Sequence, residues 1–324
     1  MTTFGYWLSS EEHTPLDLVR NASRAEELGF SYAMISDHFH PWIEAQGASA
    51  FVWAVLGGIA SATEQLELAT GVTCPMIRTH PAIVAHAAAT VGAMMPGRFT
   101  LGLGTGENLN EHVLGDRWPA PDERIELLEE AIDVIRLLWQ GGEQTHRGTH
   151  YTVDHARLYT LPDEPVQLAV AAANERAATL AGKVGGGLVS TAPSAETVEQ
   201  YRDGGGDGPC YGQVRICWSE SEEEAKETVH RLWRHSGLGG TINTELPRPS
   251  DFDAVAESVT VEMAVQDVPC GPDPEPIFAA VRAWEDAGFD HIALHQVGPD
   301  QEGFFGFWER ELAPSLAAKQ HTAA

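Results

Sequence analysis

Cysteine is scarce in this chain, and its spacing is uninformative for metal binding. Only four of the 324 residues are cysteines, and no two of them form a CxxC pair. So few thiols exclude a disulfide scaffold and argue against structural zinc. We expect buried, free thiols in a reducing compartment. The cysteines are Cys74, Cys210, Cys217 and Cys270.

Long apolar runs are also missing. No stretch approaches 18 consecutive apolar residues, and the first residues lack a basic flank followed by an apolar block. We therefore expect no membrane partner and no export, and we predict a soluble, cytoplasmic protein. With 43% hydrophobic residues the chain can bury a large core, which excludes a disordered or fibrous protein.

Positive charge is the third deficit. The chain has 47 acidic and 20 basic residues, a net charge of −27, and its only lysines are Lys183, Lys226 and Lys319. Nucleic acids and anionic lipids require clustered positive charge, so we expect neither as a partner. Because an acidic surface repels itself unless salt screens it, this composition indicates a salt-rich cytoplasm such as a halophile's. The alternative is an ordinary acidic, arginine-preferring protein from a GC-rich genome.

Short apolar runs alternate with stretches of helical period along nearly the whole chain, as in parallel βα units. Eight such runs predict a (β/α)8 TIM barrel of the α/β class, formed by one domain over residues 1–324. Two longer connections, at about 141–164 and 237–274, are expected to be insertions. The predicted strands are Phe4 to Leu8, Tyr32 to Ser36, Leu66 to Val72, Phe99 to Gly104, Val166 to Ala171, Gly187 to Thr191, Gly212 to Trp218 and His291 to Val297.

Helix signals lie between these runs. Thr14 followed by Pro15 is typical of a helix start, and Gly29 of a helix end. Residues 123–139 carry apolar side chains at steps of three and four, which predicts a helix packed on the barrel.

The loop after the second strand is the first candidate for chemistry, because the carboxyl ends of barrel strands share one face. Residues 36–42 place Asp37 beside His38 and end in Trp42. Histidine suits proton transfer near neutral pH, and a neighbouring acid can orient it. We predict a functional role for this pair; the alternative is a capping aspartate with a packed histidine.

The next two strand ends carry small residues. Gly71 and Val72 would let a flat ligand approach the backbone, unless they form a plain strand-to-helix turn. After the fourth strand, Glu107 and Asn110 lie three residues apart at a predicted helix start, so both can face the mouth. Glu107 alone is also typical of a first helical turn. The surrounding glycines match neither the GxGxxG fingerprint nor a P-loop, which disfavours a nicotinamide cofactor.

The fifth strand and the first insertion are less informative. Residues 171–174 lead into a predicted helix whose N–H groups could hold phosphate, although they also suit a simple turn. His146, His150 and His155 lack a tight ligand spacing, so we expect surface histidines and no metal. The sequence has no GxSxG motif, which argues against catalysis by a Ser/His/Asp triad.

Taken together, residues 36–42, Gly71–Val72 and residues 102–111 resemble the luciferase-like superfamily. Within it the sequence is most similar to the coenzyme F420-dependent dehydrogenases of the glucose-6-phosphate dehydrogenase type, over about residues 4–205. The resemblance implies a TIM barrel that binds coenzyme F420, a 5-deazaflavin that accepts hydride at C5. It also implies a homodimer.

The resemblance further implies roles for individual residues. His38 would be the base toward a substrate hydroxyl, Trp42 would line the reacting centre, and Glu107 would be an acid near the deazaflavin. A non-proline cis peptide is expected at Gly71–Val72. The implied cofactor-binding residues are Asp37, Gly71, Val72, Thr105, Asn110, Ala172 and Ala173.

One departure concerns the substrate. Sugar-phosphate enzymes of this group hold the phosphate with lysines and an arginine, whereas Ser194 stands where a lysine is expected. Arg215, Arg248 or Arg282 could substitute. We therefore expect hydride transfer from the alcohol carbon of a sugar, sugar phosphate or secondary alcohol to F420. The alternatives are an FMN-dependent monooxygenase, an F420H2-dependent reductase and a non-catalytic ligand-binding barrel.

The acidic composition leads to a prediction about salt. Dialysis from about 1 M salt, where screening acts over roughly 3 Å, into low salt should unfold the protein because its carboxylates then repel one another. Far-ultraviolet circular dichroism measures the loss of secondary structure. Full retention of the signal in low salt would argue against the halophile interpretation.

Overall fold

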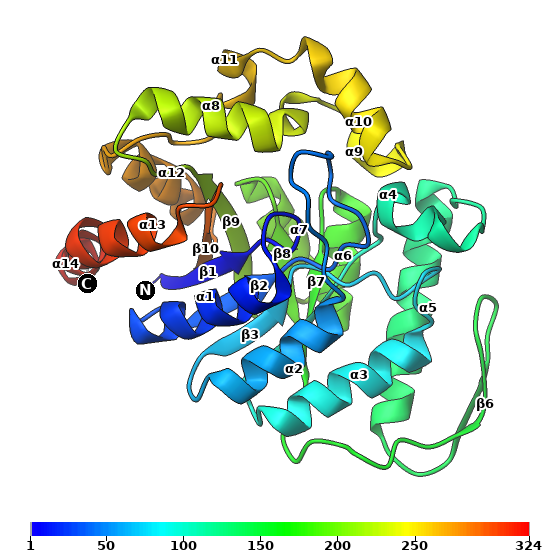
Figure 1. Cartoon of the computed structure of the whole chain (residues 1–324). Helices are drawn as coiled ribbons and strands as arrows, with labels where there is room; N and C mark the ends of the chain where they lie inside the picture. The colour runs from blue at the N-terminus through cyan, green and yellow to red at the C-terminus, as the bar shows by residue number, and fades with distance from the viewer. Residues whose placement is uncertain (1, 324) are drawn as a thin grey trace.

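Eight parallel strands close into a barrel in the computed structural model, which describes residues 2–323 (Figure 1). Around the barrel the strands follow the order β1-β10-β9-β8-β7-β4-β3-β2. They are β1 (Thr3–Leu8), β2 (Tyr32–Ile35), β3 (Glu67–Thr70), β4 (Phe99–Leu103), β7 (Gln167–Ala171), β8 (Gly187–Ser190), β9 (Cys210–Ile216) and β10 (His291–Gln296). The predicted TIM barrel is therefore confirmed, and every predicted strand is present.

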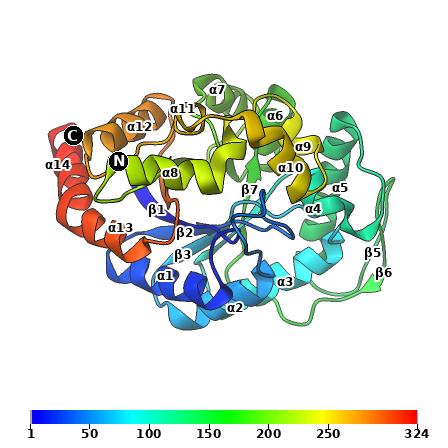
Figure 2. The same ribbon diagram turned by 45° about the horizontal axis from the view of Figure 1, so that its top comes forward.

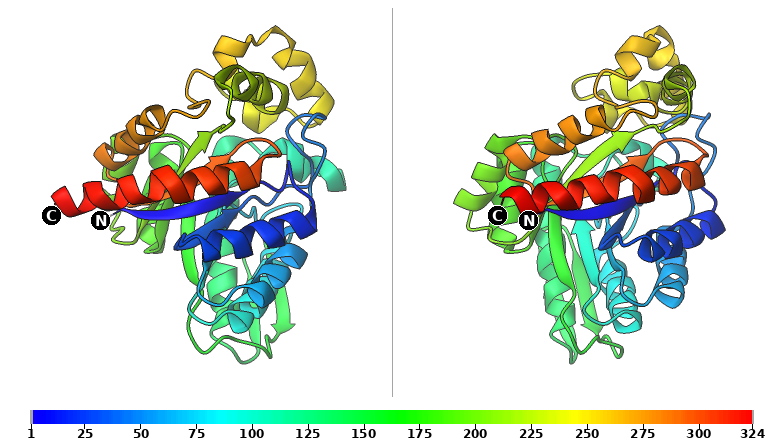
Figure 3. Two further views of the ribbon diagram at one scale, coloured as in Figure 1. Left: turned by 60° about the vertical axis from the view of Figure 1, so that its left-hand side comes forward. Right: turned by 90° about the vertical axis from the view of Figure 1, so that its left-hand side faces the viewer.

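Helices follow the strands and cover the outside of the barrel (Figures 1 and 3). They are α1 (Pro15–Glu27), α2 (Val52–Ala62), α3 (Pro81–Met94), α4 (Asn108–Glu111), α5 (Pro121–Trp139), α6 (Glu175–Val184), α7 (Ala195–Asp203), α8 (Glu222–Trp233), α12 (Glu275–Asp286), α13 (Gln301–Phe307) and α14 (Ala313–Ala323). None of the helices in residues 2–323 has the length and apolar character needed to span a membrane.

The start of α1 follows the predicted capping chemistry. Pro15 is its first residue, and the Thr14 hydroxyl oxygen accepts a hydrogen bond from the Asp17 backbone N–H. Gly29 closes the helix with a φ of 80°. Helix α5 begins at Pro121, two residues before the predicted start, because proline suits the first turn of a helix.

The two insertions contain secondary structure of their own. The first forms the hairpin β5 (Gln144–Arg147) and β6 (Thr152–Ala156). The second forms the short helices α9 (Ile242–Glu245), α10 (Pro249–Val255) and α11 (Val261–Ala264). Figures 2 and 3 show α8 to α11 as a layer over the carboxyl ends of the strands, so the second insertion covers the mouth of the barrel.

The histidines of the first insertion differ in part from the prediction. His155 is exposed, as expected, but His146 and His150 are partly buried because the hairpin packs on α5. The His146 Nε2 lies 3.0 Å from the Glu130 carboxylate of that helix. Hydrogen bonds from His146 and three backbone N–H groups outweigh burial and lower the pKa of Glu130 to about 2.

Side chains fill the inside of the barrel. A buried cluster of inward-facing residues occupies the closed sheet, so it forms a packed core rather than a channel. A ligand can therefore enter only at the mouth. The cluster comprises Trp7, Tyr32, Met34, Ala69, Ala169, Val189, Tyr211 and Ala293.

The close approach of β3 and β4 requires glycine at position 102. A Cβ at Gly102 would overlap the backbone carbonyl oxygen of Thr70 on the neighbouring strand. Gly102→Ala should therefore lower the free energy of unfolding by at least about 1–3 kcal/mol, measured by denaturant unfolding. Gly239→Ala is the matched control, because no atom lies within 4 Å of its added Cβ. Equal stability of the two variants would contradict this account of the strand contact.

Candidate active site

The side chain of Asn110 connects the loops that follow β2 and β4. Its Oδ1 accepts hydrogen bonds from the backbone N–H groups of Phe39 (2.8 Å) and His40 (3.2 Å). Its Nδ2 donates to the Glu107 carboxylate at 3.3 Å. Asn110 is only 2% exposed, so these hydrogen bonds are shielded from water. The two motifs that the sequence singled out thus form one rim of the barrel mouth.

The ring of His38 is held by a hydrogen bond at one nitrogen and faces a carboxylate with the other. Its Nδ1 lies 3.2 Å from the carbonyl oxygen of His40, and because a carbonyl only accepts, this contact requires the proton on Nδ1. The Nε2 then carries the lone pair, and it lies 3.4 Å from Oε1 of Glu11. A neutral ring in this tautomer can accept a proton at Nε2, and Glu11 can stabilise the resulting imidazolium.

Glu11 is a site residue that sequence reasoning missed. It directly follows β1 and is buried, and its Oε2 accepts hydrogen bonds from Ser9 (2.9 Å) and Ser36 (2.7 Å). The polar run at residues 9–13 was a usable signal, because it begins where the first strand ends. The residues predicted for the site all follow strands two to five.

Aromatic rings continue the site on the far side of His38. The Trp42 ring lies 5.0 Å from His38 and stacks on His235 at 5.1 Å with an interplanar angle of 15°. His235 belongs to the 3-10 helix Arg234–Gly237 and also contacts Trp233 at 5.1 Å. Burial first, and then the positive charge of Arg215, hold the pKa of His235 well below its usual value.

Asp37 does not lie free in the pocket, because its carboxylate is bound by the protein. Arg78 donates to its Oδ1 at 2.9 Å, and the Thr73 hydroxyl donates to its Oδ2 at 2.8 Å. Arg78 also binds Glu111, which is fully buried. Burial raises the pKa of Glu111, and Arg78 opposes that rise.

The strand ends of β3, β4 and β7 form a wall of small residues. The structure has a cis peptide bond between Gly71 and Val72, as predicted. Thr105 follows β4, and Ala172 and Ala173 follow β7, which pairs with β4. Ala172 is buried with its N–H bound to the Val189 carbonyl, whereas Ala173 is exposed. No bulky side chain comes from these positions, so the wall suits a flat ligand.

The opposite side of the mouth contains a further buried carboxylate, that of Glu12. It accepts hydrogen bonds from Trp233 Nε1 (2.7 Å) and Gly298 N (2.7 Å), and it lies 3.2 Å from His295 Nε2. Burial alone would raise the pKa of Glu12, but the contacts with His295 and Gly298 hold it below its usual value. Residues 2–323 contain no group of three or more histidine, cysteine or acidic side chains that could hold a metal ion.

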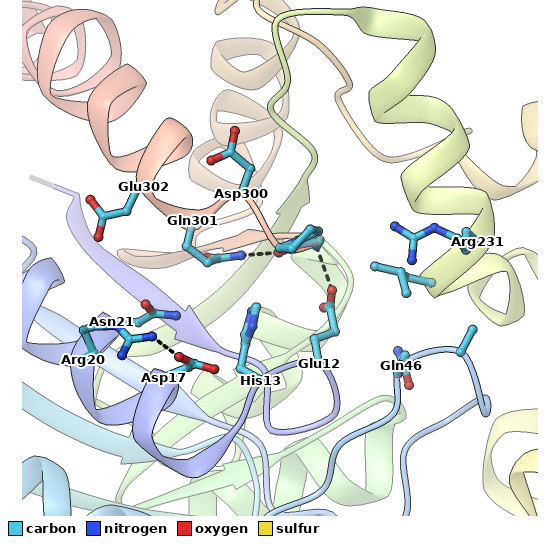
Figure 4. A pocket seen from close by; sticks show the side chains of 14 residues that line it. Glu12, His13, Asp17, Arg20, Asn21, Gln46, Arg231, Asp300, Gln301 and Glu302 are labelled. Atoms are coloured by element: carbon cyan, nitrogen blue, oxygen red, sulfur yellow. Dashed lines mark hydrogen bonds and ion pairs between the residues drawn. The ribbon is translucent and has the colours of Figure 1, made fainter.

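A cavity of about 550 Å³ lies outside Glu12, between α1, α8 and the start of α13 (Figure 4). Asp17 and Arg20 of α1 form an ion pair on one side of it, and Arg231 extends from α8 on the other. Its lining is mostly polar or charged and lacks the small-residue wall. This cavity therefore differs in character from the rim that holds His38 and Glu107.

Comparison with known proteins identifies the relatives of this barrel. The luciferase-like monooxygenase family model matches residues 1–291. The F420-dependent glucose-6-phosphate dehydrogenase of Nakamurella multipartita is 33% identical over 328 residues, which cover 97% of this chain and 96% of that protein. The chain belongs to the luciferase-like family, which confirms the resemblance in the sequence.

Solved structures agree with this assignment. An F420-dependent secondary alcohol dehydrogenase, in complex with an F420-acetone adduct, superimposes with a TM-score of 0.88 and 30% identity, over 95% of this chain and 97% of that one. The coenzyme F420 dependent tetrahydromethanopterin reductase of Methanopyrus kandleri has a TM-score of 0.78 and 18% identity, over 97% and 99% of the two chains. The latter similarity supports the fold alone.

The buried ion pairs of Arg78 predict a large stability effect. Arg78→Met should cost about 3–5 kcal/mol, because it leaves Asp37 and Glu111 buried without a counter-charge. The loss should grow as pH rises above about 4, because burial already raises the pKa of Glu111 and the opposing charge of Arg78 would be gone. Thermal unfolding between pH 4 and 8 measures both effects.

The control is Arg117→Met, which removes an exposed ion pair with Glu123. Its cost should stay within about 1 kcal/mol. If the two variants lose the same stability, the Arg78 ion pairs are no stronger than a surface pair.

Proposed function

We propose that the protein is a coenzyme F420-dependent dehydrogenase that oxidises the alcohol carbon of a small molecule. The observation that carries the proposal is the position of His38, with its Nε2 available as a proton acceptor beside Glu11. The rim also joins this base to Glu107 through Asn110. Alcohol oxidation needs a base for the hydroxyl proton and an acidic group near the cofactor.

The relatives support the cofactor and the reaction. The curated relatives named F420-dependent glucose-6-phosphate dehydrogenase match along 97% of this chain. The most similar structure described above is an F420-dependent secondary alcohol dehydrogenase bound to an F420-acetone adduct. Acetone is the ketone of a secondary alcohol, so both kinds of relative act on an alcohol carbon. They differ in whether the alcohol carries phosphate.

The residues at the mouth fit a flat tricyclic ring. We assign the wall formed by Gly71, Val72 and Thr105 to one face of the deazaflavin, because it lacks bulky side chains. Ala172 and Ala173 would line the same side further out. Asn110 and Asp37 supply polar groups at the rim. When bound, F420 supplies an acceptor for a hydride at C5.

His38 is proposed as the base. Its Nδ1 donates to the His40 carbonyl, so its Nε2 takes the hydroxyl proton as the carbinol hydrogen leaves as hydride. Glu11, held by Ser9 and Ser36, stabilises the imidazolium and is a positioning residue. A general base contributes about 10²–10⁴-fold to a rate.

Glu107 and Trp42 complete the proposed centre. Glu107 holds its carboxyl group against Asn110, where it can exchange a proton with a ligand at the small-residue wall. Trp42 lies 5.0 Å from His38 and limits the space for the substrate beside the base. Asp37, bound by Arg78 and Thr73, keeps the loop after β2 in place in addition to its proposed contact with the cofactor.

Three expectations stay predictions: the first is implied by the family resemblance, and the other two rest on composition. They are a homodimer, a cytoplasmic location and a salt-adapted surface. An FMN-dependent monooxygenase and an F420H2-dependent reductase are the alternatives within the same fold. A non-catalytic barrel would require neither His38 nor Glu107.

Titration of the purified protein with F420 and with FMN, followed by fluorescence, tests the cofactor. We expect F420 to bind and FMN not to bind. Turnover is measured as the alcohol-dependent loss of F420 absorbance. In His38→Ala, kcat should fall about 10²–10⁴-fold while the affinity for F420 stays nearly unchanged, because only the base is lost. Glu107→Gln should lower kcat and shift its pH profile.

The matched controls are His86→Ala and Glu129→Gln, which change exposed residues on α3 and α5. Both should retain the turnover of the unmodified protein. Tight FMN binding with oxygen consumption would replace the proposal by a monooxygenase, and full turnover in His38→Ala would remove its role as base.

A further inference from the structure

Arg215 lies near the end of β9, and its side chain is the last one on this strand that faces the inside of the barrel. Tyr211 belongs to the buried cluster inside the barrel, and Gln213 lies 3.0 Å from the ring of His295. Side chains alternate along a strand, so Arg215 is on the same face two residues further toward the carboxyl end. It is the register partner of His295 on β10. Arg215 therefore belongs to the mouth of the barrel.

The guanidinium of Arg215 has no hydrogen-bond acceptor in residues 2–323. Within residues 2–323, every other arginine that is not exposed donates to a carboxylate or a carbonyl. Arg215 has only the face of the Trp233 ring, 5.5 Å from its Cζ. Burial lowers its pKa, and the charge of Asp267 offsets this only in part. Arg215 is partly buried, and a partly buried cation that has no acceptor among the described residues is available to a ligand at the mouth. The other arginines in this set are Arg24, Arg78, Arg98, Arg124 and Arg234.

Ring contacts connect Arg215 to the proposed base. Trp233 lies 5.1 Å from His235, His235 stacks on Trp42 at 5.1 Å, and Trp42 lies 5.0 Å from His38. His235 also has a buried Nδ1 without a hydrogen-bond partner in the described chain. The partly buried guanidinium of Arg215 and the unsatisfied Nδ1 of His235 thus lie on the side of the mouth away from the small-residue wall. The other arginines considered for this role are unsuitable, since Arg248 is paired with Asp251 and Arg282 is exposed on α12.

We infer that Arg215 and His235 bind the carboxylate of the alcohol substrate, which makes the substrate a hydroxycarboxylate. This inference rests on the proposed dehydrogenase function. The carboxylate would take the planar fork of Arg215 and a hydrogen bond from His235 Nδ1, with its hydroxyl directed to His38. Two electrons leave the alcohol as the C–H bond breaks and hydride passes to F420. The O–H proton passes to His38, and the product is the oxo acid.

The charge of the mouth favours a carboxylate over a phosphate. One guanidinium beside a neutral imidazole supplies a single positive charge, which balances a monoanion. Glu11 and Glu12 would repel a phosphate dianion more strongly than a carboxylate monoanion. Neither Lys183, which is exposed on α6, nor Lys226, which is paired with Glu222, adds a second cation there.

The test compares three donors at constant salt: 3-hydroxybutyrate, propan-2-ol and glycerol 3-phosphate. For the unmodified protein we expect the highest kcat/KM with 3-hydroxybutyrate. In Arg215→Gln the preference for 3-hydroxybutyrate over propan-2-ol should fall about 10–100-fold, mainly through KM, because a charge-assisted hydrogen bond is lost. Arg215→Lys should retain part of this preference. His235→Phe, which keeps the ring stacking, should lower the preference less than Arg215→Gln does.

Stability distinguishes binding from a structural role. Because Arg215 has no acceptor to lose, the melting temperature of Arg215→Gln should equal or exceed that of the unmodified protein. Arg282→Gln, which changes an exposed arginine, should alter neither the preference nor the melting temperature. A large fall in melting temperature for Arg215→Gln would assign Arg215 a structural role instead.

The outcomes separate this inference from the proposed function. Turnover that is fastest with glycerol 3-phosphate, or with propan-2-ol regardless of Arg215, would overturn the carboxylate site and leave the dehydrogenase intact. Absence of F420 turnover with every donor would overturn the proposed function. In that case tryptophan fluorescence tests the carboxylate site, because Trp233 contacts Arg215. Addition of 3-hydroxybutyrate should change the emission of the unmodified protein and not that of Arg215→Gln. Equal responses would refute the site.

Discussion

The arrangement of the mouth depends on the buried amide of Asn110. Its carbonyl oxygen holds two backbone N–H groups of the loop after β2, and its amide nitrogen holds Glu107. Strand β3 lies between β2 and β4 in the closed sheet, so no backbone pairing joins the two loops directly. A single side chain with both a donor and two lone pairs can bridge that gap. The proposed base and acid therefore keep one relative position.

Compensation of buried charge organises the rest of the site. Asp37 and Glu111 share Arg78, and Glu12 is bound by His295 and Trp233. In a chain with a net charge of −27, each buried carboxylate has a donor that stabilises it. Arg215 is the reverse case, a cation without an acceptor. This contrast separates side chains that stabilise the fold from one that is available to a ligand.

Some features of the fold and the site followed from local pattern, and others did not. Alternation of apolar runs and helical stretches was enough to find every barrel strand, although the seventh begins at Cys210 rather than Gly212. Glu11 escaped notice because a glutamate after a strand is unremarkable until Ser36 and His38 are brought to it. Arg215 was one of three arginines considered, and only the pairing of Arg248 and the exposure of Arg282 distinguish it.

The sequence alone determined the barrel and the motif residues around His38 and Glu107, because these depend on period and short spacings. The family resemblance that those motifs carry implied the position of the cis peptide. The sequence also determined the acidic surface, since composition sets net charge. Only the tertiary structure decided which partners those residues have. Glu11, Asn110 and His235 reach the same mouth from positions up to 224 residues apart. A hydrogen bond or a missing counter-charge is a property of atoms in space, which strand closure creates and linear order does not record.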